Sequence, residues 1–123
     1  MTTDRTSDLQ DLTDAIVAFR DERDWRQFHR LKDLVLSVGV EAGELMELTQ
    51  WKSEAELDAA LESDPDFRRR LGDEAADVLL YLLLVCEKAG IDLGDAARDK
   101  MVANAAKYPA DRARGNARKY TEL

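Results

Sequence analysis

The chain has 123 residues, 45% of them apolar and 36% charged, with a formal net charge of −8. This length fits one domain with its own core, so we expect a single domain over 1–123. The negative charge argues against a nucleic-acid backbone as the partner. The longest apolar run, 78–86, is too short for a bilayer span, which takes about 20 residues. The polar N-terminus has no apolar core of a signal peptide, and one cysteine allows no internal disulfide, so we expect a cytoplasmic protein.

Apolar residues recur with helical periodicity along most of the chain, which predicts an all-α, four-helix-bundle-type fold. Ser7 and Ser53 are expected to cap helices at their N-termini, and Gly90 to end one in a left-handed conformation. Pro109 stops the last helix. The basic segment 109–123 shows little periodicity and is expected to be an extended tail. The expected helices cover 7–24, 31–51, a short 53–63, 66–90 and 95–108.

The run 78–86 has no polar face except Tyr81. A helix that is apolar all round has to be covered on all sides. Four short helices cover only part of such a helix, so the run predicts burial against a second copy of the chain. We therefore expect at least a homodimer.

Four carboxylates interrupt the two most apolar helices. Glu41 and Glu44 lie in VGVEAGELMELTQW (38–51), and Glu74 and Asp77 lie in DEAADVLLYLLLVC (73–86). Because successive helical residues turn by about 100°, each pair shares a face, and Glu41 is in line with apolar neighbours. The two pairs can therefore face each other across a groove between helices.

An ionised carboxylate in such a place is costly unless it is paired or bound to a metal. No Lys or Arg lies on these faces within one turn of Glu41 or Glu44. Carboxylate oxygens without Cys or His are the ligands that Mg²⁺ or Mn²⁺ prefers. Either pair alone is more often a solvated helix face. Two pairs in two apolar stripes favour a metal site made by Glu41, Glu44, Glu74 and Asp77.

Aromatic residues lie near each acidic pair. Trp51 follows Glu44 by seven residues and Tyr81 follows Asp77 by four, while DWRQFHRL adds Trp25 and the only histidine, His29. Such rings can stack on a nucleobase. Core packing is the alternative for the rings, and a capping or packing role is the alternative for His29.

The segment KMVANAAKYP places Lys100, Asn104 and Lys107 on one helix face. Two cations and an amide on one stripe suit a polyphosphate, although a solvated stripe would look the same. Together with the acids and aromatics, this face indicates a nucleoside polyphosphate as the small-molecule ligand.

These segments, with ERDWRQFH, GDEAADVLLYLLLVCEKAGIDL and the closing RGNARKYTEL, resemble the all-α nucleoside triphosphate pyrophosphohydrolases, the MazG-like superfamily. Among these, the dCTP pyrophosphatase branch is most similar. The resemblance covers about 21–123. It departs at Thr49, where related sequences often have an aromatic residue, and this bears on which base is selected.

The resemblance implies Mg²⁺-dependent hydrolysis of a deoxynucleoside triphosphate, dCTP first, to the monophosphate and pyrophosphate. It implies homodimers or dimer-of-dimers tetramers in which partner subunits help to close each site. dUTP or a broader set of modified nucleotides is the alternative substrate class. A helical interaction module that binds a basic partner in an acidic groove, without catalysis, is the rival class.

The residues and the resemblance together lead to a hypothesis for the role of each residue named above. Glu44, or else Glu41, would orient or deprotonate the attacking water, and Lys100 and Lys107 would stabilise charge on the phosphates. The implied metal ligands are Glu41, Glu44, Glu74 and Asp77. The implied substrate-binding residues are Trp25, His29, Trp51, Tyr81, Lys100, Asn104, Lys107 and Tyr108.

Overall fold

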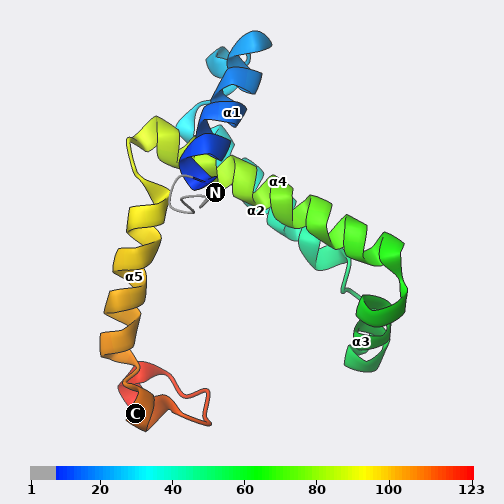
Figure 1. Ribbon diagram of the computed structural model, residues 1–123, viewed down its shortest axis with the longest axis vertical. Helices are drawn as coiled ribbons and strands as arrows, with labels where there is room; N and C mark the ends of the chain where they lie inside the picture. The colour runs from blue at the N-terminus through cyan, green and yellow to red at the C-terminus, as the bar shows by residue number, and fades with distance from the viewer. Residues whose placement is uncertain (1–7) are drawn as a thin grey trace, which may run out of the picture. The chain divides into compact units, whose positions relative to one another are not determined.

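The computed structural model describes residues 8–123 (Figure 1). No strand occurs among them, so the predicted all-α class is confirmed. The expected cap Ser7 lies outside the described residues. None of the helices within 8–123 is long and apolar enough to cross a membrane. The elements are α1 (Asp8–Glu22), η2 (Arg26–Phe28), α2 (Leu31–Glu47), α3 (Glu54–Ser63), α4 (Pro65–Ala89), α5 (Leu93–Lys107), α6 (Ala110–Ala113) and η3 (Tyr120–Glu122).

Helix ends follow the predicted local signals at Ser53 and Gly90, and the structure adds a cap at Asp64 that was not predicted. The Ser53 side chain accepts a hydrogen bond from the Glu56 backbone N–H at 3.1 Å, which caps α3. The Asp64 carboxylate accepts from the backbone N–H groups of residues 66 and 67 and caps α4. Gly90 ends α4 with φ of 70°, a conformation that glycine adopts without steric cost. The ends at Ser53 and Gly90 depend only on neighbouring residues, which is why the sequence predicts them.

The predicted helix over 31–51 was too long, because α2 ends at Glu47. The Met46 carbonyl accepts hydrogen bonds from the backbone N–H and the hydroxyl of Thr49, at 3.0 and 2.9 Å, and from the Gln50 N–H. A threonine hydroxyl competes in this way with helical hydrogen bonds. The chain leaves the helix as a turn, and Trp51 has φ of 68°, which is unusual for a bulky residue.

The predicted extended tail over 109–123 was also wrong in part, because α6 and η3 lie within it. Pro109 cannot donate a hydrogen bond to continue α5, but its carbonyl accepts from the N–H groups of Arg112 and Ala113. The proline therefore ends one helix and begins the next.

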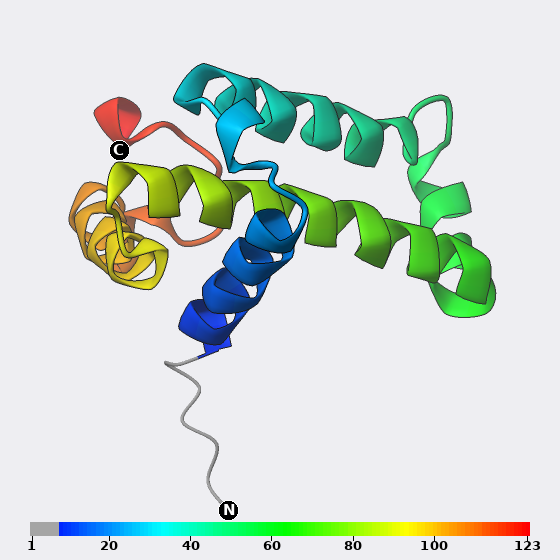
Figure 2. The ribbon, with the colours of Figure 1, turned by 90° about the horizontal axis from the view of Figure 1, so that it is seen from above.

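The chain divides into two compact units, one ending at Gly90 and the other beginning at Ile91. In the first unit, α2 and α4 run antiparallel side by side, as both views show (Figures 1 and 2). Helix α1 packs against α4. The buried apolar side chains come from α2 and α4: Leu34, Phe67, Leu83, Leu84 and Cys86.

Every residue of the apolar run 78–86 is half-buried or buried within the single chain. The single chain thus covers much of this run, and burial of the rest against a second copy stays a prediction. Exposed apolar side chains instead gather on the outer face of α2, at Leu31, Val35, Leu36, Val40 and Met46.

The second unit is built on α5, whose N-terminus is capped by the Asp92 side chain accepting from the Asp95 N–H at 2.9 Å. The rings of Tyr108 and Tyr120 meet edge to face, with centroids 6.0 Å apart. The Lys107 ammonium lies 4.9 Å from the centroid of the Tyr120 ring. These contacts join the end of α5 to η3.

Candidate active site

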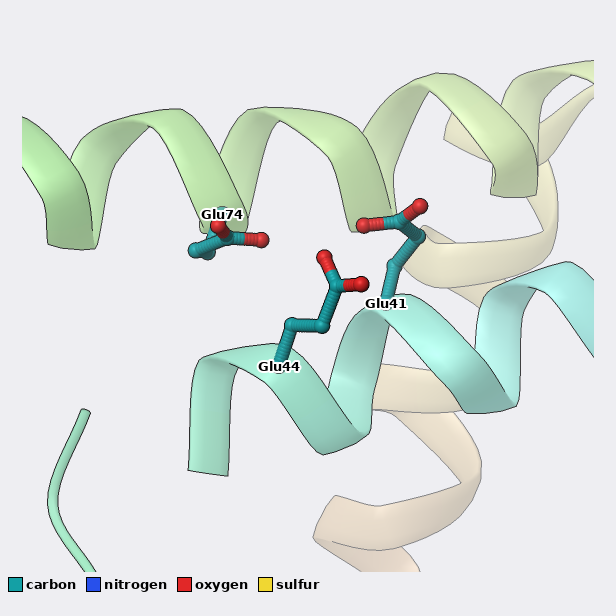
Figure 3. Close-up of side chains that lie close together, drawn as sticks. All are labelled: Glu41, Glu44 and Glu74. Atoms are coloured by element: carbon teal, nitrogen blue, oxygen red, sulfur yellow. The ribbon is translucent and has the colours of Figure 1, made fainter. Parts of the chain in front are cut away.

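Three of the four predicted metal ligands come together between α2 and α4. Glu41 and Glu44 extend from α2 and Glu74 from α4 (Figure 3), and one carboxylate oxygen of each lies within 4.8 Å of the others. Glu41 and Glu74 are half-buried and Glu44 is exposed. Glu41 and Glu44 thus face Glu74 across the helix pair, as the spacing predicted for these three residues.

The three carboxylates of this acidic cluster repel one another, and two of them are partly desolvated. The Oε2 atoms of Glu41 and Glu74 are buried and have no hydrogen-bond partner among residues 8–123. Burial raises the pKa of Glu41 above its ordinary value. The neighbouring Glu44 carboxylate and the negative charges of Asp77 and Glu74 raise it further. Burial and then the Glu44 carboxylate raise the pKa of Glu74. Among residues 8–123, the buried oxygens of this cluster therefore receive neither a hydrogen bond nor an ion pair.

A hard divalent cation fits these residues. The donors are carboxylate oxygens only, which suits Mg²⁺ or Mn²⁺ and not zinc. A bound cation would satisfy the two buried oxygens and neutralise the repulsion that raises the pKa values. Glu41, Glu44 and Glu74 are therefore the residues that could hold the metal.

Asp77, the fourth predicted ligand, lies outside this close group. It is exposed, one turn of α4 beyond Glu74, yet its charge contributes to the raised pKa of Glu41. Asp77 also lines a pocket of 310 Å³ between α1 and α4. It thus lies between the acidic cluster and this pocket.

The pocket gathers three of the four aromatic residues predicted to bind a base. Trp25, His29 and Tyr81 line it together with Asp77 and Arg20. The remaining lining is apolar and comes from the same two helices: Ile16, Phe19, Leu80 and Leu84. Aromatic and aliphatic walls with a few polar groups are typical of small-molecule sites.

The end of α1 positions Trp25 at the pocket. Asp24 adopts φ of 54°, its N–H donates to the Asp21 carbonyl, and the Trp25 N–H donates to the Arg20 carbonyl, both at 3.1 Å. This is a Schellman helix end with a left-handed residue, which normally brings an apolar contact. Here the contact is the Trp25 ring against the Phe19 ring, with centroids 5.8 Å apart.

His29 is half-buried, and its Nδ1 is buried without a hydrogen-bond partner in the described part of the chain. Burial lowers the pKa of His29, and the positive charges of Arg20 and Lys88 lower it further. The imidazole is therefore neutral at pH 7, with one ring nitrogen as donor and the other as acceptor.

Arg20 is the pocket residue that the sequence reasoning missed. It is only 5% exposed and forms ion pairs with Asp21 at 2.9 Å and Glu87 at 3.0 Å. The signal was available, because Arg20 follows Ile16 by four residues and so falls in the apolar stripe of its helix. A buried arginine requires an acidic partner, and Glu87 on α4 supplies one.

The structure does not bring Trp51 to the pocket. Its side chain is 92% exposed in the turn after α2, because the helix that would have carried it ends at Glu47. In the second unit, Lys100, Asn104 and Lys107 are exposed on α5, on one helix face. Tyr108, also exposed, contacts Tyr120.

An antiparallel helix pair with facing carboxylates and an adjoining aromatic pocket is therefore the candidate active site of this all-α protein. The MazG-like family model matches residues 36–123. Two relatives, dCTP pyrophosphatase 1 of Homo sapiens and of Rattus norvegicus, are 43% and 42% identical over 115 residues. These matches cover 94% of this chain and 67% of each relative.

A crystal structure of a pyrophosphatase from Archaeoglobus fulgidus matches with a TM-score of 0.74 at 39% identity. The match covers 81% of this chain and 91% of that one. The chain belongs to the MazG-like family and is a pyrophosphohydrolase.

Proposed function

We propose that the chain hydrolyses a deoxynucleoside triphosphate, dCTP first, to the monophosphate and pyrophosphate. The observation that carries this is the unsatisfied acidic cluster next to an aromatic pocket, with Asp77 common to both surroundings. The name of the similar mammalian proteins, dCTP pyrophosphatase 1, supports dCTP as the substrate. The role is then control of the nucleotide pool in the cytoplasm.

The acidic residues hold the cation and prepare the water. Glu41, Glu44, Glu74 and Asp77 would hold Mg²⁺, which would supply positive charge for the phosphates. Glu44 is the exposed member of the close group, so water reaches its carboxylate most readily. We assign Glu44 to orient the attacking water and take its proton, with Glu41 as the alternative base.

The pocket binds the base. Trp25 and Tyr81 offer ring faces for stacking, and the neutral His29 offers a hydrogen bond to the base edge. Water is excluded by the apolar side chains of α1 and α4 that complete the wall.

The exposed face of α5 binds the phosphates in this proposal. Lys100 and Lys107 supply charge and Asn104 an amide donor. The Lys107 ammonium rests on the Tyr120 ring, and Tyr108 contacts the same ring. The family model runs through both units, which supports one MazG-like domain over the chain.

We further propose that the chain forms a homodimer or a dimer-of-dimers tetramer through the outer face of α2. Gly39 and Gly43 lie among its exposed apolar side chains, and an added Cβ at either would meet nothing within 4 Å. Nothing within residues 8–123 thus requires glycine at these positions, although glycine costs about 1 kcal/mol in a helix. Sedimentation velocity should show a dimer or larger for the wild type and a monomer for Leu36→Glu. A wild-type monomer at micromolar concentration would contradict the proposal.

The deciding experiment incubates the protein with each deoxynucleoside triphosphate and Mg²⁺, with and without EDTA, and measures pyrophosphate. We expect release to be fastest with dCTP and abolished by EDTA. Faster release with dUTP, or similar release with many nucleotides, would favour the broader hydrolase. No release from any nucleotide would favour the binding module.

A further inference from the structure

Arg20 is a buried cation in the wall of the pocket. Its Nε donates to Asp21 at 2.9 Å and its Nη1 to Glu87 at 3.0 Å. One partner lies on α1 and the other on α4, 67 residues away from Arg20 along the chain. The guanidinium is thus fixed from two sides before any ligand arrives, so little conformational entropy is lost when it binds one.

These two ion pairs leave most of the guanidinium unused. A guanidinium carries five N–H donors and no acceptor. Within residues 8–123, Nη2 takes part in no hydrogen bond or ion pair, and Nη1 uses one donor. The unused donors belong to a side chain that lines the pocket beside His29 and Tyr81. Burying a cation only to join two helices gives little stability over an apolar pair.

We propose that Arg20 is a specificity-determining residue that donates hydrogen bonds to the acceptor edge of cytosine. This inference rests on the proposed function, since it concerns the base bound in the same pocket. Cytosine presents the O2 carbonyl and the unprotonated N3 next to each other, both acceptors. Uracil and thymine carry an N3–H donor beside O2, which meets a donor-only guanidinium unfavourably. A buried polar group left facing the wrong partner is a strong source of discrimination.

The test measures binding of monophosphates, so that it does not depend on turnover. Isothermal titration compares dCMP, dUMP and 2-deoxyribose 5-phosphate on the full chain. The wild type should bind dCMP at least about tenfold tighter than dUMP. In the double variant Arg20→Ala/Glu87→Ala, which leaves no unpaired glutamate behind, the preference should fall to within about twofold. Affinity for the sugar phosphate should stay unchanged, because it has no base.

Two single variants separate reading of the base from a structural role. Glu87→Gln keeps Arg20 and a hydrogen-bonding partner, so it should keep the preference for dCMP. Arg20→Lys keeps the charge with fewer donors and should give an intermediate preference. If the double variant does not fold, the ratio of dCMP affinity to dUMP affinity in Arg20→Lys decides the question.

An unchanged dCMP preference in the double variant, or in Arg20→Lys where only that variant folds, overturns the proposal. A wild type that shows no dCMP preference, or binds neither monophosphate, overturns it too. A preference that depends on Arg20 in a protein releasing no pyrophosphate from any nucleotide would instead overturn the proposed function alone.

Discussion

Two charged clusters flank α4, and they are built on opposite principles. Glu41, Glu44 and Glu74 bring three like charges within 4.8 Å. Arg20, Asp21 and Glu87 bring one cation between two anions. In the first cluster the pKa values of Glu41 and Glu74 are raised, and in the second the hydrogen bond from Arg20 lowers the pKa of Asp21.

The difference shows two ways in which a site can be prepared for a ligand. The second cluster balances its own charges, while Arg20 keeps unused N–H donors beside the pocket. The acidic cluster does not balance its charges, so it lowers the stability of the folded chain as long as no ligand is bound. Groups kept in an unfavourable arrangement are where a ligand is to be expected.

The largest effect should come from neutralising the acidic cluster. Glu44→Gln, Glu41→Gln or Asp77→Asn is expected to lower kcat/KM for dCTP by at least about 100-fold, because each removes charge needed to hold the metal or handle the water. Circular dichroism should show unchanged helix content. Glu47→Gln, exposed on the same helix, is the matched control and should retain normal rates. Normal rates in both Glu44→Gln and Asp77→Asn would contradict the assignment.

The next largest effect should come from metal binding, which would neutralise the acidic cluster as Arg20 neutralises Asp21 and Glu87. Mg²⁺ at about 100 times its Kd is expected to raise Tm by roughly 5–15 °C, since a ligand that binds only the native state stabilises it. Differential scanning fluorimetry measures this against NaCl at matched ionic strength. Glu41→Gln should show a smaller shift. Equal shifts with both salts would exclude a specific cation site.

Breaking the compensated cluster should cost stability directly. Glu87→Ala leaves Arg20 with one partner and is expected to lower the free energy of unfolding by roughly 1–3 kcal/mol. Urea denaturation measures this change. The double variant Arg20→Ala/Glu87→Ala should lose less free energy of unfolding than its two single variants lose when their losses are added. Arg69→Ala removes only exposed ion pairs and should change the urea midpoint little. A wild-type midpoint for Glu87→Ala would show that the pair is not structural.

The smallest effect is a pH dependence of opposite sign in the two clusters. The folded pKa of Glu41 is raised above its ordinary value of 4.5, so its protonation stabilises the fold below that pH, and this contribution is lost as pH rises through the folded pKa. In EDTA, Glu41→Gln should therefore be more stable than the wild type at pH 7, and the gap should close near pH 4.5.

Asp21 should behave in the other direction. Its folded pKa is lowered from 3.8, so the stability it contributes is present above that pH and is lost as pH falls through the folded pKa. Urea midpoints of Asp21→Asn should lie below those of the wild type at pH 7, with the gap closing in acid. If the stability difference between wild type and either variant did not change with pH, the assigned direction of that residue's pKa shift would be wrong.

The sequence by itself determined the local features of the protein. Apolar periodicity located the main helices, and Ser53 and Gly90 located two of their ends, because caps depend on residues a few positions apart. The i, i+3 spacing of Glu41 and Glu44 placed both on one face of α2, and the matching spacing on α4 predicted that Glu74 would face them. These features follow from helix geometry alone.

Only the tertiary structure decided which distant residues meet. The pairing of Arg20 with Glu87 depends on how α1 packs on α4, which no local pattern encodes. The structure also decided that Trp51 lies outside the pocket, although helical spacing placed it on the acidic face, because α2 ends at Glu47 and the chain turns there. The sequence determines which residues share a helix face, whereas the packing of the helices determines which residues of different helices come into contact.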